Sequence, residues 1–332
     1  MKNRKYDVTA LGELLIDFTE NGDSAQGNPL MEANPGGAPC NVLAMLQKLG
    51  KKTAFIGKVG NDMFGNQLKK AVEEVGIDTR NLIMDHKHHT TLAFVHTYPD
   101  GDRDFSFYRD PGADMMLTKE EVQKELIEDS RIFHFGTLSS THEGVREATR
   151  HAIELAKEAG CIITFDPNLR PPLWNSLDDA RREIEYGMGK CDVLKISDNE
   201  VEFLFGTTDY DKGAALIREK YNIPLVLITM GKDGSRAYYK DLRVEAAPFL
   251  QENTIETTGA GDYFLRKRSQ RMFLEHGLEN LTAENFKRAS DLCQRSRFSD
   301  HHQKRRASRY AVQRRSSGIY RIQTVIFPWN RL

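Results

Sequence analysis

The sequence has few cysteines and no long apolar run. Its cysteines, Cys40, Cys161, Cys191 and Cys293, are widely spaced, and no pair has the spacing of a metal site or a redox motif. No apolar run reaches the roughly 20 residues of a membrane span. The charged start MKNRKYDV leads directly into a strand pattern, which argues against a signal peptide. We therefore expect a cytoplasmic protein with reduced thiols and no membrane partner.

Net charge is nearly absent as well, because 47 Lys and Arg oppose 48 Asp and Glu. The charges are unevenly distributed, however. Residues 1–262 hold 31 basic and 43 acidic side chains, whereas residues 263–332 hold 16 basic and 5 acidic ones. Such a basic tail is typical of a nucleic-acid-binding arm. We favour a different origin for it, given below, and expect no nucleic-acid partner.

Short apolar runs alternate with amphipathic stretches. The runs predict strands at Tyr6–Gly12, Thr53–Val59, Arg131–Phe135, Cys161–Asp166, Asp192–Ile196 and Leu225–Thr229. Helical spacing follows near 66–75, 142–159, 178–189 and 211–221. This alternation indicates an α/β fold with a mainly parallel sheet and helices on both faces. Ligands of such sheets bind beyond the carboxyl ends of the strands.

Two segments depart from this alternation. Residues 91–108 alternate with period two around a Pro-Asp-Gly-Asp turn, which predicts a hairpin, and residues 13–33 are extended. We expect a small β-sheet lid formed by about 13–35 and 90–113.

Four glycine- or asparagine-containing motifs carry the functional argument. In Thr257–Asp262, Gly259, Ala260 and Gly261 can turn their amides toward an anion, and Asp262 can act as a general base. The companions are Asn34–Asn41, before an apolar helix, and two strand-end motifs, Asp166–Arg170 and Thr229–Gly234. Each alone could be an ordinary turn or helix cap. Together they predict one site at the strand ends.

These residues resemble the ribokinase-like (PfkB) carbohydrate kinases, and fructokinases in particular, over residues 6–262. The two family signatures match at Gly36–Asn41 and Glu256–Asp262, and the fructokinase-like stretches are Phe107–Asp114 and Asp166–Trp174. The resemblance implies a ribokinase-like three-layer α/β/α fold with a β-sheet lid. It also implies transfer of the ATP γ-phosphate to the 6-hydroxyl of D-fructose, with Mg²⁺.

The resemblance also assigns roles to residues. Asp262 is the expected base, the Gly259–Gly261 amides the expected anion hole, and Arg170 a further expected catalytic group that meets sugar or phosphate oxygens. The expected sugar contacts are Asp17, Gly36, Gly37, Asn41, Arg109 and Asn168. The expected nucleotide contacts are Lys195, Glu200, Thr229, Gly231 and Gly234, and Glu200 also holds the metal indirectly, through water. A homodimer through the lid is a further expectation.

Several alternatives stay open. Glu256 stands where the family usually has Asp, so K⁺ as a second cofactor is undecided, and Ser197 replaces the usual Asn of an Asn-x-x-Glu element. The acceptor could instead be another sugar or sugar acid, such as ribose or 2-keto-3-deoxygluconate. The chain could also be an inactive sugar-binding homologue.

The sequence departs most from the family after Phe264. The expected helix reads LRKRSQR, with four basic residues in seven and no apolar face, and Gln294–Arg315 is similarly aberrant. With suitable codons, reading one base forward restores F-F-G-N-A-L-S-V after Phe264 and a family-like helix, loop and helix after Cys293. We therefore interpret residues 1–292 as the kinase domain and residues 293–332 as an aberrant basic segment that is out of frame.

Overall fold

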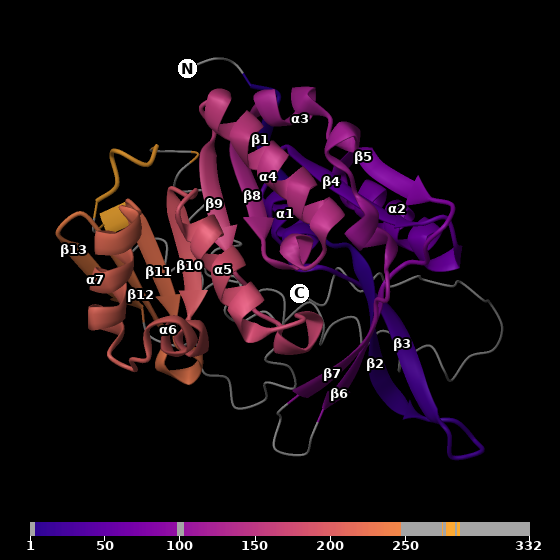
Figure 1. The fold of residues 1–332 in the computed structure, drawn as a ribbon. Coiled ribbons are helices and arrows are strands. Elements are labelled where there is room, and N and C mark those ends of the chain that lie inside the picture. The colour runs from indigo at the N-terminus through magenta and orange to yellow at the C-terminus, as the bar shows by residue number, and fades with distance from the viewer. Residues whose placement is uncertain (1–3, 98–102, 247–273, 275–276, 283, 286–332) are drawn as a thin grey trace, which may run out of the picture.

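Two β-sheets of unequal size organise the residues that this computed structural model describes, which are 4–97, 103–246, 274, 277–282 and 284–285 (Figure 1). The larger sheet has the strand order β13-β12-β11-β10-β9-β8-β1-β4-β5, and the smaller has the order β3-β2-β6-β7. The smaller sheet projects from one end of the larger (Figure 1). The turn at 99–102, the Gly259–Asp262 motif and the segment 293–332 lie outside the described residues.

The large sheet is parallel except at one edge. Its strands β1, β4, β5, β8, β9, β10 and β11 run parallel, whereas β12 and β13 are antiparallel. All six predicted strands are confirmed to within one or two residues at their ends, and β5, β12 and β13 are additional. The bounds are β1 (Tyr6–Leu11), β4 (Thr53–Gly60), β5 (Asp78–Asp85), β8 (Ser130–Gly136), β9 (Ile162–Asp166), β10 (Val193–Ser197), β11 (Leu225–Thr229), β12 (Ser235–Tyr239) and β13 (Leu242–Ala246).

Helices pack on both faces of this sheet and form two separate apolar cores. One core includes α1 (Ala38–Lys48) and α2 (Met63–Val75). The other includes α3 (Lys124–Glu128), α4 (Glu143–Glu158), α5 (Leu177–Met188), α6 (Asp198–Phe205) and α7 (Tyr210–Tyr221). Because strand side chains alternate between faces, each central strand contributes to both cores. The three-layer α/β/α prediction and the four predicted helices are confirmed.

The lid consists of β2 (Leu15–Asp23), β3 (Pro29–Gly36), β6 (Leu92–Thr97) and β7 (Arg103–Tyr108), as the two extended segments predicted. The register places Asp17, Ala93 and Phe107 on one face of the lid, because paired residues of neighbouring strands point to the same side. The opposite face carries Phe18 and Phe94, whose rings stack with centroids 4.8 Å apart. Polar and aromatic groups thus share the first face, which is the face of Asp17.

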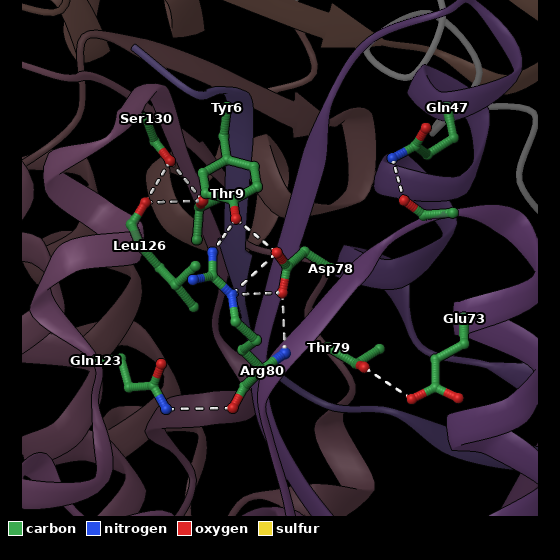
Figure 2. A network of polar contacts seen from close by, with 11 residues as sticks. Tyr6, Thr9, Gln47, Glu73, Asp78, Thr79, Arg80, Gln123, Leu126 and Ser130 are labelled. Carbon is green, nitrogen blue, oxygen red and sulfur yellow. Dashed lines mark hydrogen bonds and ion pairs between the residues drawn. The ribbon is translucent and has the colours of Figure 1, made fainter.

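A polar network ties strands together at the edge of the large sheet where the parallel strands begin. Figure 2 shows the Tyr6 hydroxyl donating to Asp78 Oδ2 at 2.5 Å, and Arg80 Nε donating to Asp78 Oδ1 at 3.1 Å. Nearby, the Thr9 and Ser130 hydroxyls both donate to the Leu126 carbonyl. This network joins β1, β5 and β8 at their amino ends. The predicted site lies at the carboxyl ends of the strands, so we interpret the network as structural.

Candidate active site

Most of the predicted motifs lie on the side of the large sheet where the parallel strands end. Gly136 pairs with Asp166 at the ends of β8 and β9, and Ser197 pairs with Thr229 at the ends of β10 and β11. The chain leaves β1 at the same edge, through Gly12, and enters the lid. The site therefore combines loops of the large sheet with the base of the lid.

The Gly36-Gly37 turn packs directly against the start of the lid. A side chain on Gly36 would collide with the carboxylate of Asp17, and one on Gly37 would collide with the main-chain carbonyl of Glu13. Gly37 also has a φ of 114°, in a region that favours glycine. Only glycines permit this close approach, which sets the Asp17 carboxylate beside the turn.

Asn41 has an unused hydrogen-bonding atom in this region. It lies in the first turn of α1, where its amide N–H donates to the Gly37 carbonyl at 3.0 Å. Its side-chain Oδ1 is buried and has no hydrogen-bond partner among the described residues. A buried acceptor without a partner is costly. Asn41 is thus suited to accept a hydrogen bond from a ligand hydroxyl.

Arg109 is buried at the base of the lid and is held by three neighbours. Its Nε donates to Asp114 Oδ2 at 2.8 Å, Nη1 to Thr141 Oγ1 at 2.8 Å and Nη2 to the Leu138 carbonyl at 3.0 Å. The Thr91 hydroxyl donates to the other oxygen of Asp114 at 2.5 Å. Asp114 therefore ties both strands of the β6–β7 hairpin to the body of the protein. The sugar contact predicted for Arg109 stays a prediction.

Asn168 lies beside a small cavity between the sheet and α1. Its φ of 49° is left-handed, which asparagine tolerates better than most residues. The preceding carbonyl, of Pro167, accepts hydrogen bonds from the amide and the hydroxyl of Thr137, at 3.2 Å and 2.5 Å. The cavity is lined by residues at the carboxyl ends of β1, β8 and β9 and at the start of α1, namely Glu13, Ala38, Pro39, His134, Gly136, Thr137, Leu138, Asp166 and Asn168.

Arg170 reaches from the loop after β9 to the lid. Its guanidinium lies over the ring of Phe105 in β7, with its carbon 5.6 Å from the ring centroid. This distance is within the range of a cation–π interaction. Phe105 stacks in turn on Phe107, with centroids 6.0 Å apart. Arg170 thus connects the large-sheet body to the face of the lid that carries Asp17.

The predicted nucleotide side begins with a buried ion pair. Lys195 Nζ in β10 lies 3.0 Å from Asp166 Oδ1 at the end of β9, and both side chains are buried. Glu200 is also buried. Its Oε1 accepts the Leu169 amide at 2.7 Å and its Oε2 accepts the Ser197 amide at 2.8 Å. Glu200 therefore fixes the loop after β9 to the start of α6.

The structure explains the Ser197 replacement. The Ser197 hydroxyl accepts the Glu200 amide at 3.3 Å while Glu200 accepts the Ser197 amide, which is a capping box. Serine is among the best residues at this helix position, so the replacement preserves the local structure.

Thr229, Gly231 and Gly234 lie at the next strand end. Thr229 closes β11, and Gly231 and Gly234 have φ values of 49° and 90° around the short 3-10 turn η5 (Gly231–Asp233). The Met230 amide donates to the Gly234 carbonyl at 2.8 Å, which closes the turn tightly. Such a glycine turn leaves room for a flat ligand group beside the main chain.

The described carboxylates of the site would suit Mg²⁺ that is bound mainly through water and substrate phosphates. Among the described residues, no three His, Cys, Asp or Glu side chains are grouped as metal ligands. Mg²⁺ commonly keeps several waters and binds through one or two carboxylates plus substrate phosphates. Glu200, whose oxygens already accept two main-chain amides, fits contact through water better than direct coordination.

Two site residues were not predicted. Glu13 is buried beside the Gly36-Gly37 turn, and Asp114 pairs with Arg109. Glu13 is the one acidic residue in the apolar run Ala10–Ile16, and an acid in such a run is a signal that could have identified it.

Comparison with known proteins identifies the class as a carbohydrate kinase, an enzyme that transfers a phosphate group to an alcohol. The sequence model of the pfkB family of carbohydrate kinases matches residues 5–265, so the chain belongs to this family. The sequence is 41% identical over 260 residues to fructokinase-2 of Solanum lycopersicum, which covers 78% of this chain and 79% of that protein.

Solved structures agree with this. A fructokinase of Xylella fastidiosa with bound ATP is 29% identical, with a TM-score of 0.72 over 86% of this chain and 85% of that one. A double mutant of the Vibrio cholerae O395 fructokinase with fructose, ADP and a potassium ion bound is 27% identical. Its TM-score is 0.76, over 89% of this chain and 91% of that one. The predicted ribokinase-like fold with a small β-sheet lid is thereby confirmed, and the structure gives the lid four strands.

Proposed function

We propose that this sugar kinase is an ATP-dependent fructokinase that phosphorylates the 6-hydroxyl of D-fructose. The observation that carries the proposal is the buried Asn41 Oδ1, which has no partner among the described residues and lies in the first turn after Gly37. Asp17 contacts the same Gly36-Gly37 turn from the lid. An amide and a carboxylate around one turn suit adjacent hydroxyls of a sugar. The fructokinases similar to this chain support fructose as that sugar.

The proposed chemistry places Asp262 as the base that accepts the hydroxyl proton, while the amides of Gly259, Ala260 and Gly261 stabilise the transferring phosphate. Arg170 adds positive charge near the acceptor. Mg²⁺, when bound, neutralises charge on the phosphates. Lys195, Glu200, Thr229, Gly231 and Gly234 form the nucleotide side in this proposal, and Asn168 and Arg109 complete the sugar side.

A coupled ADP-release assay across a sugar panel tests the substrate. We expect turnover of fructose, and good turnover of ribose or 2-keto-3-deoxygluconate without fructose would refute the choice. Asp262→Asn should lower kcat by about 10²- to 10⁴-fold without abolishing sugar binding. Fructose binding by calorimetry with no ATP turnover at all would instead favour the inactive sugar-binding homologue.

The sugar contact of Asp17 can be tested with a control on the same strand. Asp17→Ala should abolish measurable fructose binding, because it removes an acceptor from the site. Asp23→Ala removes the same group at the exposed far end of β2 and should leave binding unchanged. Equal losses in both variants would contradict the assignment.

Two further features belong to the proposal. K⁺ is a candidate activator, supported by the potassium ion in the related Vibrio cholerae structure, and an assay with Na⁺ in place of K⁺ tests it. A homodimer through the lid is supported by the exposed lid side chains Leu30, Met31 and Tyr108. Sedimentation of the full chain should give a dimer, and Tyr108→Glu should weaken it.

We further propose that the sequence leaves its reading frame after Phe264 and that residues 293–332 form an out-of-frame basic segment. The end of the family match at residue 265 supports this. The coding DNA over residues 260–332 and an intact mass test the frame. A gene continuously in frame with the printed residues would refute the proposal.

None of the helices that the structure describes is long and apolar enough to cross a membrane.

A further inference from the structure

Glu13 is a buried acid at the point where the chain passes from the large sheet into the lid. It lies between the end of β1 at Leu11 and the start of β2 at Leu15, and it is only 4% exposed. An ionisable side chain is rarely buried this completely unless it has partners. Its partners therefore indicate its role.

The Glu13 carboxyl group caps α1 from outside the helix. Its Oε1 accepts the amide of Ala38, the first residue of α1, at 2.8 Å. The N-cap residue itself is Gly37, which has no side chain to do this. A negative charge at a helix start is also favoured by the helix dipole. Glu13 thus replaces the cap that the glycine turn cannot provide.

The main chain around Glu13 fits the same turn. A side chain on Gly37 would collide with the Glu13 carbonyl, and one on Gly12 would approach Pro39 Cγ at 2.6 Å. The segment 12–14 and the start of α1 are therefore in direct contact, with both the side chain and the main chain of Glu13 contributing. Displacing Glu13 would release the turn that lies beside Asp17.

The charged surroundings of Glu13 belong to the site. Burial raises the pKa of Glu13 to about 7, its own amide and that of Ala38 lower it, Asp114 raises it and Arg109 lowers it. Glu13 in turn raises the pKa of Cys40, after the larger effect of burial. His134 and Asp166 line the same cavity. The carboxyl group therefore lies between the Arg109–Asp114 ion pair at the base of the lid and the strand-end loops.

We propose that Glu13 is a positioning residue for the sugar: it caps α1 and fixes the Gly36-Gly37 turn, so that Asp17 and Asn41 meet the same ligand. This rests on the proposed function, because Asp17 and Asn41 are the proposed sugar contacts. Glu13 acts through the turn and not through the reacting atoms.

Two variants of the full chain test the role. Glu13→Ala removes the cap, whereas Glu13→Gln keeps an oxygen that can accept the Ala38 amide. Glu74→Ala, which removes an exposed glutamate from the end of α2, is the matched control. We would measure hydrogen exchange of residues 36–43 and fructose affinity by calorimetry at pH 6 and pH 8.

We expect Glu13→Ala to speed exchange in this segment and to weaken fructose binding about tenfold, as for loss of a charged hydrogen bond. Glu13→Gln should restore most of both. The affinity of wild type for fructose should decrease as the pH is lowered from 8 to 6, because a neutral carboxyl group is the weaker acceptor. The affinity of Glu13→Gln should not change over this range. Glu74→Ala should match wild type.

The outcomes separate this inference from the proposed function. Wild-type fructose binding together with unchanged exchange and affinity in Glu13→Ala would overturn the inference and leave the function standing. No fructose binding by wild type, with faster exchange in Glu13→Ala, would overturn the function and support the cap. A wild-type pH dependence that persists in Glu13→Gln would also overturn the inference.

Discussion

The ion pair between Arg109 and Asp114 should be one of the most sensitive points of the fold. Arg109 Nη2 and Asp114 Oδ2 are 2.7 Å apart, and both side chains are only 2% exposed. In Asp114→Ala, Arg109 keeps Thr141 and Leu138 as acceptors but loses the carboxylate with which it forms its ion pair. Leaving a buried charge unpaired costs about 3–5 kcal/mol.

A surface pair of equal length isolates the effect of burial. Lys190 Nζ and Glu154 Oε1 are also 2.7 Å apart, but their side chains are 28% and 51% exposed. Solvent screens this pair, so Glu154→Ala should cost less than about 1 kcal/mol. The difference between the two variants therefore measures what burial adds to the same contact.

Equilibrium unfolding in urea, followed by circular dichroism, gives both free energies if the denaturant slope stays constant. Asp114→Asn keeps the shape of the side chain and should cost less than Asp114→Ala. The double variant Arg109→Met/Asp114→Leu should cost less than the sum of its parts, because it leaves no buried charge. If Asp114→Ala costs no more than Glu154→Ala, the reasoning is refuted.

Three further predictions follow from the same structure. Gly37 has a φ of 114°, and an added side chain would collide with Glu13, so Gly37→Ala should cost more than about 2 kcal/mol in urea unfolding. Gly50 has open space around it, so Gly50→Ala should cost about 1 kcal/mol. Equal costs would contradict the close-packing argument. Since burial raises the pKa of Glu13 from 4.5 to about 7, its contribution to stability is present below pH 4.5 and is lost as the pH rises through 7. Between pH 5 and pH 8, the unfolding free energy of wild type should therefore decrease by up to about 3 kcal/mol more than that of Glu13→Gln. Parallel pH profiles of the two proteins would disprove this. A double-mutant cycle of Phe105→Leu and Arg170→Met should give a coupling of about 0.5–1 kcal/mol, and a coupling of zero would exclude the cation–π contact.

The central strands could be predicted because their local pattern and their burial agree. Leu225–Thr229 is an uninterrupted apolar run, and the structure buries all five residues in β11. Edge strands lack this signal. Strand β5 contains Asp78, Arg80 and Asp85, and only two of its eight residues are buried, so its sequence does not distinguish it from a loop.

The site residues divide in the same way. Motifs such as Gly36-Gly37 and Asp166–Arg170 could be located from the sequence, because glycine, proline and asparagine requirements are local properties of the main chain. Arg109 illustrates the limit. Its place near the lid was predictable, but its acceptors Asp114, Thr141 and Leu138 come together only when the hairpin meets the loop after β8.

The sequence alone therefore determined the α/β alternation, the lid segments and the motifs at the strand ends, since each depends on neighbours along the chain. Tertiary structure decided which charges are buried and which groups they face. Glu13 is the clearest case: it caps α1 through the Ala38 amide, and burial raises its pKa, which Ala38 and Arg109 lower and Asp114 raises further. Residues 25 to about 100 positions away supply those contacts, and electrostatic energies depend on distance and burial in space.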